Sequence, residues 1–201
     1  LLVLLILGMK RRQLWYPRAA SICCLSYLLF AFTQHRQAES AQAALIDRRD
    51  HTAARQIVKP SIGNVFLHRS VYLHDGVYYV DAIHVCPGLT PKIYPGGEIE
   101  VYEIPNADPA PSANPRMAKD VARFARLSDG FLGQHPEAAD VIGDVRYGML
   151  PTSTVPLWGI KINPAQPETA AEFVKFRIIG PGDKEAFYGM LFRRDLPGGK
   201  E

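Results

Sequence analysis

The stretch Trp15–Thr33, WYPRAASICCLSYLLFAFT, constrains the fold of this chain most, because it runs for 19 residues with a single charge, Arg18. As a helix rising about 1.5 Å per residue, it would reach about 28 Å, close to the ~30 Å thickness of bilayer hydrocarbon. Trp15 and Tyr16, at its start, are residue types that favour the membrane–water boundary. We therefore predict a transmembrane helix over residues 15–33, which delivers the rest of the chain to a membrane surface.

The apolar run Leu1–Gly8 precedes this stretch and is too short to cross a bilayer. We interpret residues 1–8 as the end of a truncated membrane helix and residues 9–14 as a basic loop, so the chain would be the C-terminal part of a larger protein. Lys10, Arg11 and Arg12 place that loop in the cytoplasm under the positive-inside rule. We therefore expect a multi-pass protein of a bacterial inner membrane, with its soluble domain in the periplasm.

A second interpretation starts the protein at Met9. Its basic residues and the apolar run after them would then form a signal peptide, with a cleavage site among the small residues of 38–44. The product would be a secreted domain. A domain on the cytoplasmic side is a third alternative, since the charge asymmetry across residues 15–33 is modest.

Charge is distributed unevenly along the chain. Residues 1–57 hold 8 Lys and Arg against 3 Asp and Glu, whereas residues 58–201 hold 15 against 17. The basic excess therefore lies beside the expected membrane segment, where it meets anionic lipid. The remainder lacks the positive field of a nucleic-acid-binding domain, so we expect a lipid bilayer and no nucleic acid as partners.

The rest of the chain reads as one domain behind a stalk. Residues 34–57 are rich in Ala and Gln but carry only a thin apolar stripe, which predicts a solvated helical stalk that ends before Pro60. Residues 58–196 predict a soluble α+β domain with an antiparallel sheet and two or three helices, and residues 197–201 form a tail. We expect helices over 115–127 and 185–193, and further strands over 98–104, 141–149, 156–162 and 172–179.

Two alternating segments flank Asp75-Gly76, the dipeptide that a type I′ hairpin turn prefers. A two-residue loop there pairs Ser70 with Asp81. The face that carries Arg69 is the more apolar one and is expected to meet the core. The opposite face, which carries His68, Ser70 and Asp81, is expected to be polar.

His68, Ser70 and Asp81 are the residue types of a hydrolase triad. A triad histidine must bridge the serine and the carboxylate, whereas here Ser70 and Asp81 face each other directly, which favours a solvated polar face instead. Asp81 and His84 point to opposite faces, and no HExxH or CxxC motif occurs. We therefore predict neither a metal site nor a cofactor in this chain, and the three cysteines form no disulfide framework.

Asp144 and Arg146 lie in the phrase VIGDVRYGMLP and would share one face of a strand. One interpretation is an ion pair over the sheet. The other is a site that binds an anion or a partner. Both remain open at this point.

Several phrases together resemble one family: WYPRAA, NVFLHRSVY, DGVYYVDAI, FARLSDGF, VIGDVRYGMLPT, PLWGI, FVKFR and EAFYGML. They are similar to the C-terminal half of bacterial inner-membrane metal-dependent hydrolases of the LexA-regulated, membrane-bound type, in the same order over nearly all of residues 14–194. The resemblance implies an integral membrane protein whose soluble domain is accessory to an upstream membrane core. A divalent metal and the catalytic residues would belong to that core, so no catalytic residue is assigned here and no substrate is indicated. The alternative is a membrane-tethered or secreted domain that binds a ligand or partner without enzymatic activity.

Overall fold

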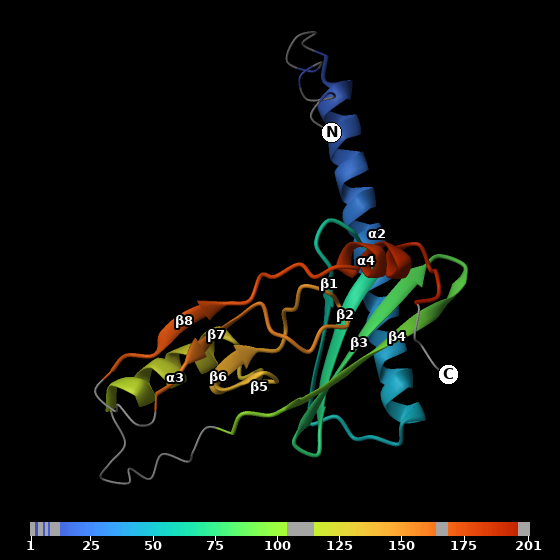
Figure 1. Ribbon diagram of the computed structural model, residues 1–201. Helices are drawn as coiled ribbons and strands as arrows, with labels where there is room; N and C mark the ends of the chain where they lie inside the picture. The colour runs from blue at the N-terminus through green and yellow to red at the C-terminus, as the bar shows by residue number, and fades with distance from the viewer. Residues whose placement is uncertain are drawn as a thin grey trace.

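The computed structural model describes residues 13–103, 115–163 and 169–196, together with residues 3, 6 and 8. This part of the chain is an α+β fold with two four-stranded antiparallel sheets, as Figure 1 shows. The α+β class and the antiparallel pairing predicted from the sequence are confirmed. The predictions for residues 1–8, 9–14 and 197–201 fall wholly or mostly outside the described residues.

Each sheet is a simple meander, because its strands lie side by side in chain order. Sheet A consists of β1 (Arg55–Pro60), β2 (Leu67–His74), β3 (Val77–Cys86) and β4 (Leu89–Glu100). Sheet B consists of β5 (Leu132–His135), β6 (Ala138–Asp144), β7 (Trp158–Lys161) and β8 (Glu172–Lys175). The helices are α2 (Trp15–Arg48), α3 (Pro115–Leu127) and α4 (Asp183–Leu191).

The central hairpin has the predicted register. Ser70 pairs with Asp81 across β2 and β3, and His74 pairs with Val77 beside the turn. Asp75 and Gly76 have φ of 45° and 79°, the positive values that a type I′ turn requires. A short local signal therefore determined the alignment of β2 with β3.

The second half of α2 packs against sheet A, and the predicted solvated stalk over residues 34–57 is wrong. One side of this half is buried at Gln34, Ala38, Gln42, Leu45 and Ile46, a spacing that follows the helix period. The helix ends at Arg48, and β1 has begun by Arg55, so the domain includes residues that were assigned to the stalk. The two glutamines made the buried side look polar in the sequence.

The first half of α2 projects away from both sheets (Figure 1). None of the helices in the described ranges is long and apolar enough to cross a membrane, so the predicted transmembrane helix over residues 15–33 is not supported. Arg18, Ser21 and Ser26 interrupt the apolar character of this half. Its large apolar side chains are nevertheless exposed at Ile22, Leu25, Tyr27, Leu28, Leu29 and Phe32.

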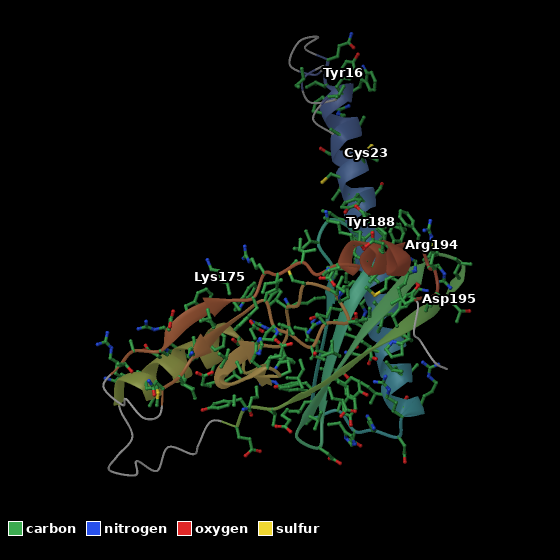
Figure 2. All side chains as sticks on the ribbon, viewed as in Figure 1. Tyr16, Cys23, Lys175, Tyr188, Arg194 and Asp195 are labelled. Atoms are coloured by element: carbon green, nitrogen blue, oxygen red, sulfur yellow. The ribbon has the colours of Figure 1, made fainter. Side chains whose placement is uncertain are left out.

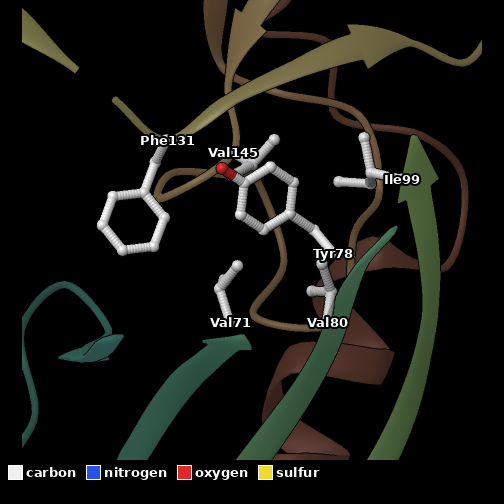
Figure 3. Packing of buried hydrophobic residues seen from close by; sticks show 6 residues of the cluster. All are labelled: Val71, Tyr78, Val80, Ile99, Phe131 and Val145. Carbon is white, nitrogen blue, oxygen red and sulfur yellow. The ribbon is translucent and has the colours of Figure 1, made fainter. Parts of the chain in front are cut away.

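A shared core joins the two sheets. Val71, Tyr78 and Val80 from the central hairpin pack with Ile99, and Phe131 and Val145 enter from sheet B and its loops (Figure 3). Sheet B has its own core, which α3 covers with Val121 and Phe124. On sheet A, α4 lies on the face opposite α2 and buries Met190 against Leu67 and Ala82.

Candidate functional site

The hairpin face that carries His68, Ser70 and Asp81 lies beneath α2 and is buried, so its interpretation as a solvated face is wrong. The Gln42 side chain donates a hydrogen bond of 2.9 Å to the Ser70 hydroxyl and also donates to the Val71 carbonyl. The Arg49 guanidinium donates to both carboxylate oxygens of Asp81, at 2.7 and 2.9 Å. Ser70 and Asp81 thus have separate partners from α2, and the structure does not assemble a triad.

Burial determines the protonation of this face. The pKa of His68 is lowered to about 4, mainly because the ring is buried and water cannot solvate its protonated, positively charged form. The ring centroids of His35 and His68 lie 5.9 Å apart. In both residues Nδ1 has no hydrogen-bond partner among the described residues. The hydrogen bonds to Asp81 raise the pKa of Arg49 above its ordinary value, so the guanidinium remains charged. No group of three possible metal ligands occurs in the described ranges.

Asp144 and Arg146 form the predicted ion pair in bidentate geometry. Arg146 Nε donates to Asp144 Oδ1 at 2.9 Å, and Nη2 donates to Oδ2 at 2.8 Å. Nη2 also donates to the Leu127 carbonyl at 2.7 Å, which links the end of α3 to the loop after β6. The Asp144 contact raises the pKa of Arg146. This ion pair does not pack over the open sheet but forms part of a groove wall.

Two adjoining hollows of about 450 and 640 Å³ meet at Arg146, Tyr147 and Trp158. We call them together the Arg146 groove. The smaller hollow lies between α3 and sheet B, and Ser128 lines it with a buried hydroxyl that has no partner in the described chain. The larger hollow extends to the loop after β1 and to Phe187 of α4. The groove therefore crosses the junction between the two sheets.

Aromatic rings and cations meet at the centre of the groove. The Tyr147 and Trp158 rings lie 4.8 Å apart between centroids. Lys59 Nζ lies 4.9 Å from the centroid of the Tyr147 ring. Arg146, the neighbour of Tyr147 in the loop after β6, has its Cζ 5.4 Å from the same centroid. Among the described residues, the larger hollow is lined by four cationic side chains, those of Lys59, Arg69, Arg146 and Arg177, and by no carboxylate.

Arg69 holds the floor of the larger hollow. Its guanidinium donates hydrogen bonds to four backbone carbonyls of the loop between β6 and β7, those of Val145, Leu150, Pro151 and Ser153. Burial lowers the pKa of Arg69 below its ordinary value, with Asp144 opposing the shift. An arginine on the more apolar face of the hairpin is the sequence signal for this role.

The cations of the larger hollow differ in their availability. Arg69 is occupied by carbonyls, and Arg146 by Asp144 and Leu127. Lys59 and Arg177 have no carboxylate partner within the described part of the chain, and Arg177 is exposed. Two cations in a hollow that also holds the tilted rings of Tyr147 and Trp158 suit a ligand that joins an anionic group to an apolar or aromatic one.

Comparison with family models, with curated protein sequences and with solved structures finds no match for this chain.

Proposed function

We propose that this chain is a membrane-attached binding domain. The projecting segment, residues 21–33 of α2, attaches it to the membrane, and the Arg146 groove binds an anionic ligand. The observation that carries the binding role is the pair of unneutralised cations, Lys59 and Arg177, in a hollow walled by Tyr147 and Trp158.

The exposed apolar residues of the projecting segment support membrane attachment. All but Tyr27 fall on one side of the helix, at positions 22, 25, 28, 29 and 32, and an exposed apolar stripe of this kind requires an apolar environment along that side. The mainly apolar run of 19–32 would extend about 21 Å as a helix, less than the ~30 Å of bilayer hydrocarbon. Such a segment enters the membrane to part of its depth or beside other apolar helices. Where the segment crosses beside other apolar helices, the positive-inside rule favours the periplasmic side of an inner membrane for the domain, because Lys10, Arg11 and Arg12 precede the segment.

The chemistry of the groove supports an anionic ligand. Lys59 and Arg177 supply positive charge without carboxylates to neutralise it, and Tyr147 and Trp158 supply flat apolar surface. In the smaller hollow, the unpaired Ser128 hydroxyl can donate to or accept from a polar group of the same ligand. Because Arg146 is already held by Asp144, it positions the Tyr147 ring rather than offering a free charge.

A second candidate is the accessory domain of a membrane-bound metal-dependent hydrolase, as the family resemblance implies. The phrases FARLSDGF, VIGDVRYGMLPT and PLWGI, which carry much of that resemblance, all contribute to the walls of the Arg146 groove. In this role the groove would hold a ligand or a partner segment for a metal centre in the upstream membrane core. Apolar helices with paired histidines and aspartates upstream of Leu1 would support this role, and their absence from the complete reading frame would refute it.

Trp158 provides a direct probe of the groove, because the chain has two tryptophans and Trp15 can be replaced. In a Trp15→Phe background, emission then comes from the groove alone. We expect phenyl phosphate, which joins an anion to a ring, to change this emission saturably. Inorganic phosphate and phenol each supply one half of that chemistry and should act only at higher concentration.

The matched control is the variant Lys59→Gln/Arg177→Gln, which keeps the length of the polar stem at position 59 and removes both charges. The response to phenyl phosphate should weaken in this variant while the response to phenol stays the same. If phenyl phosphate is no better than phenol, or if the variant responds like the parent, the groove does not bind an anion.

A further inference from the structure

A second exposed apolar surface lies at the end of sheet A from which α2 projects. We define the α4 rim as Ile62, Lys184, Tyr188, Phe192 and Arg194. Tyr188 and Phe192 are 54% and 62% exposed, and Ile62 is 93% exposed. The exposed parts of these side chains bury no apolar surface within the fold, which indicates that they meet an apolar or interfacial environment.

The aromatic side chains of the rim are ordered along the outer face of α4 and just beyond it. Lys184, Tyr188 and Phe192 follow one another at intervals of four residues, which aligns them on one side of a helix. The two rings stack at 6.2 Å with an interplanar angle of 15°. Arg194 Cζ lies 6.0 Å from the Phe192 centroid, so the aromatic pair is flanked by a cation at each end.

The loop that carries Ile62 is built to hold it outward. Asn64 Oδ1 accepts hydrogen bonds from the backbone N–H groups of Phe66 and Leu67 at 3.0 and 2.7 Å, and its Nδ2 donates to the Ser61 hydroxyl at 2.8 Å. Gly63 takes φ of 80°, with no atom near the position of a Cβ. The exposed isoleucine therefore stands on a rigid turn and not on a loose one.

The rim faces the same side as the projecting segment. Phe30 of α2 meets Phe66 edge to face at 5.9 Å, which places the Ile62 loop at the base of that segment. In Figure 1, α4 and the loop after β1 lie at the end of sheet A from which α2 projects. Figure 2 shows Tyr188 on the side of α4 towards the projecting segment.

We propose that the α4 rim rests on the surface of the same bilayer that the projecting segment enters, and so fixes the orientation of the domain on the membrane. Tyrosine and arginine favour the headgroup region, and Ile62 and Phe192 reach the acyl boundary beneath it. The larger hollow of the Arg146 groove is lined by Ser61, Ile62 and Phe187, so it would open next to the lipid surface. This inference depends on the membrane attachment proposed above, and it adds which face meets the lipid.

Spin labels test the proposal on the whole chain in vesicles of phosphatidylethanolamine and phosphatidylglycerol. The three native cysteines are replaced by alanine, and single cysteines are introduced as Ile62→Cys, Tyr188→Cys, Leu28→Cys and Asp75→Cys. The native side chains at all four positions are exposed, so labelling should leave the fold intact. Asp75 is the control, because β2 separates it from the Ile62 loop by eight residues, about 27 Å of extended strand.

We expect the labels at positions 62, 188 and 28 to lose collisions with a water-soluble nickel complex and gain collisions with oxygen when vesicles are added, while the label at 75 does not change. If position 28 shifts and positions 62 and 188 behave like 75, attachment holds and the rim does not meet lipid. If position 28 does not shift either, the attachment itself fails. Dipolar broadening between labels at 188 without a shift towards oxygen would assign the rim to a second copy of the chain, and would also overturn the proposal.

Discussion

Replacing Arg69 by methionine tests whether one buried cation builds the floor of the groove. The substitution keeps an unbranched apolar stem of similar length and removes all the hydrogen bonds to the carbonyls of Val145, Leu150, Pro151 and Ser153. The bonds to Val145 and Pro151 are fully buried, and the other two lie where water can replace the guanidinium.

The magnitude follows from these four acceptors. A buried acceptor left without a partner costs about 1–3 kcal/mol, so the carbonyls of Val145 and Pro151 together cost about 2–6 kcal/mol. Removing a desolvated charge returns part of this, which leaves an expected loss of about 3 kcal/mol in the free energy of unfolding. Small domains have about 5–15 kcal/mol in total, so the loss is easily measured.

Urea unfolding followed by circular dichroism measures the loss, and amide hydrogen exchange shows where it acts. We expect faster exchange in residues 145–153 than in the hairpin of β2 and β3. Arg177→Met is the matched control, because that arginine is exposed and should change stability by less than about 0.5 kcal/mol. If the two variants are equally stable, the carbonyl contacts of Arg69 do not hold the loop, and the account of the groove floor is wrong.

Two further predictions concern the face beneath α2. His68 has a pKa of about 4 in the folded chain against about 6.5 when unfolded, so only the unfolded state binds a proton at His68 as the pH falls through this range. The free energy of unfolding should therefore decrease by about 3 kcal/mol between pH 6.5 and 4. In urea titrations at each pH, His68→Gln should show a smaller decrease. Asp81→Asn leaves the Arg49 charge facing a neutral amide, and breaking a buried ion pair costs about 3–5 kcal/mol in the free energy of unfolding. The exposed pair of Asp140 and Lys161 is the control. Asp140→Asn should cost less than about 1 kcal/mol in the same denaturation assay. A loss for Asp81→Asn no larger than the control loss would contradict a structural role for this carboxylate.

Local signals in the sequence were sufficient for several elements. The Asp75-Gly76 turn determined the hairpin register, since its geometry depends on two adjacent residues. The range 115–127 was predicted as a helix and is α3, with Val121 and Phe124 buried as expected, although Leu127 is exposed. The final helix begins and ends two residues earlier than predicted.

Elements that depend on distant partners were predicted less well. β4 begins at Leu89, nine residues before the strand that was predicted over 98–104. It is an edge strand, which tolerates proline, and Gly96 lies so close to β3 that a Cβ there would stand 2.4 Å from the Val80 carbonyl oxygen. Such a requirement exists only once β3 is in place.

The candidate site shows the same division. Asp144 and Arg146 were paired correctly from their spacing within one segment. The groove around them also needs Lys59 and Arg177, which come from segments far away in the chain, and Arg69 beneath them. His68, Ser70 and Asp81 were correctly aligned with one another, but the helix that buries them was predicted to be a solvated stalk. The helix and its C-cap make polar contacts with this face, Gln42 with Ser70 and Arg49 with Asp81, so a wide apolar stripe is not needed for burial.

Flotation of the whole chain with vesicles of phosphatidylethanolamine and phosphatidylglycerol tests the central claim, membrane attachment through the projecting segment, most directly. We expect the chain to float with the vesicles. The variant Leu25→Asp/Leu29→Asp changes two exposed residues that contribute nothing to the core, so it should stay folded and remain at the bottom of the gradient. If the parent chain stays at the bottom, or if the variant floats as well as the parent, the projecting segment does not attach this protein to a membrane.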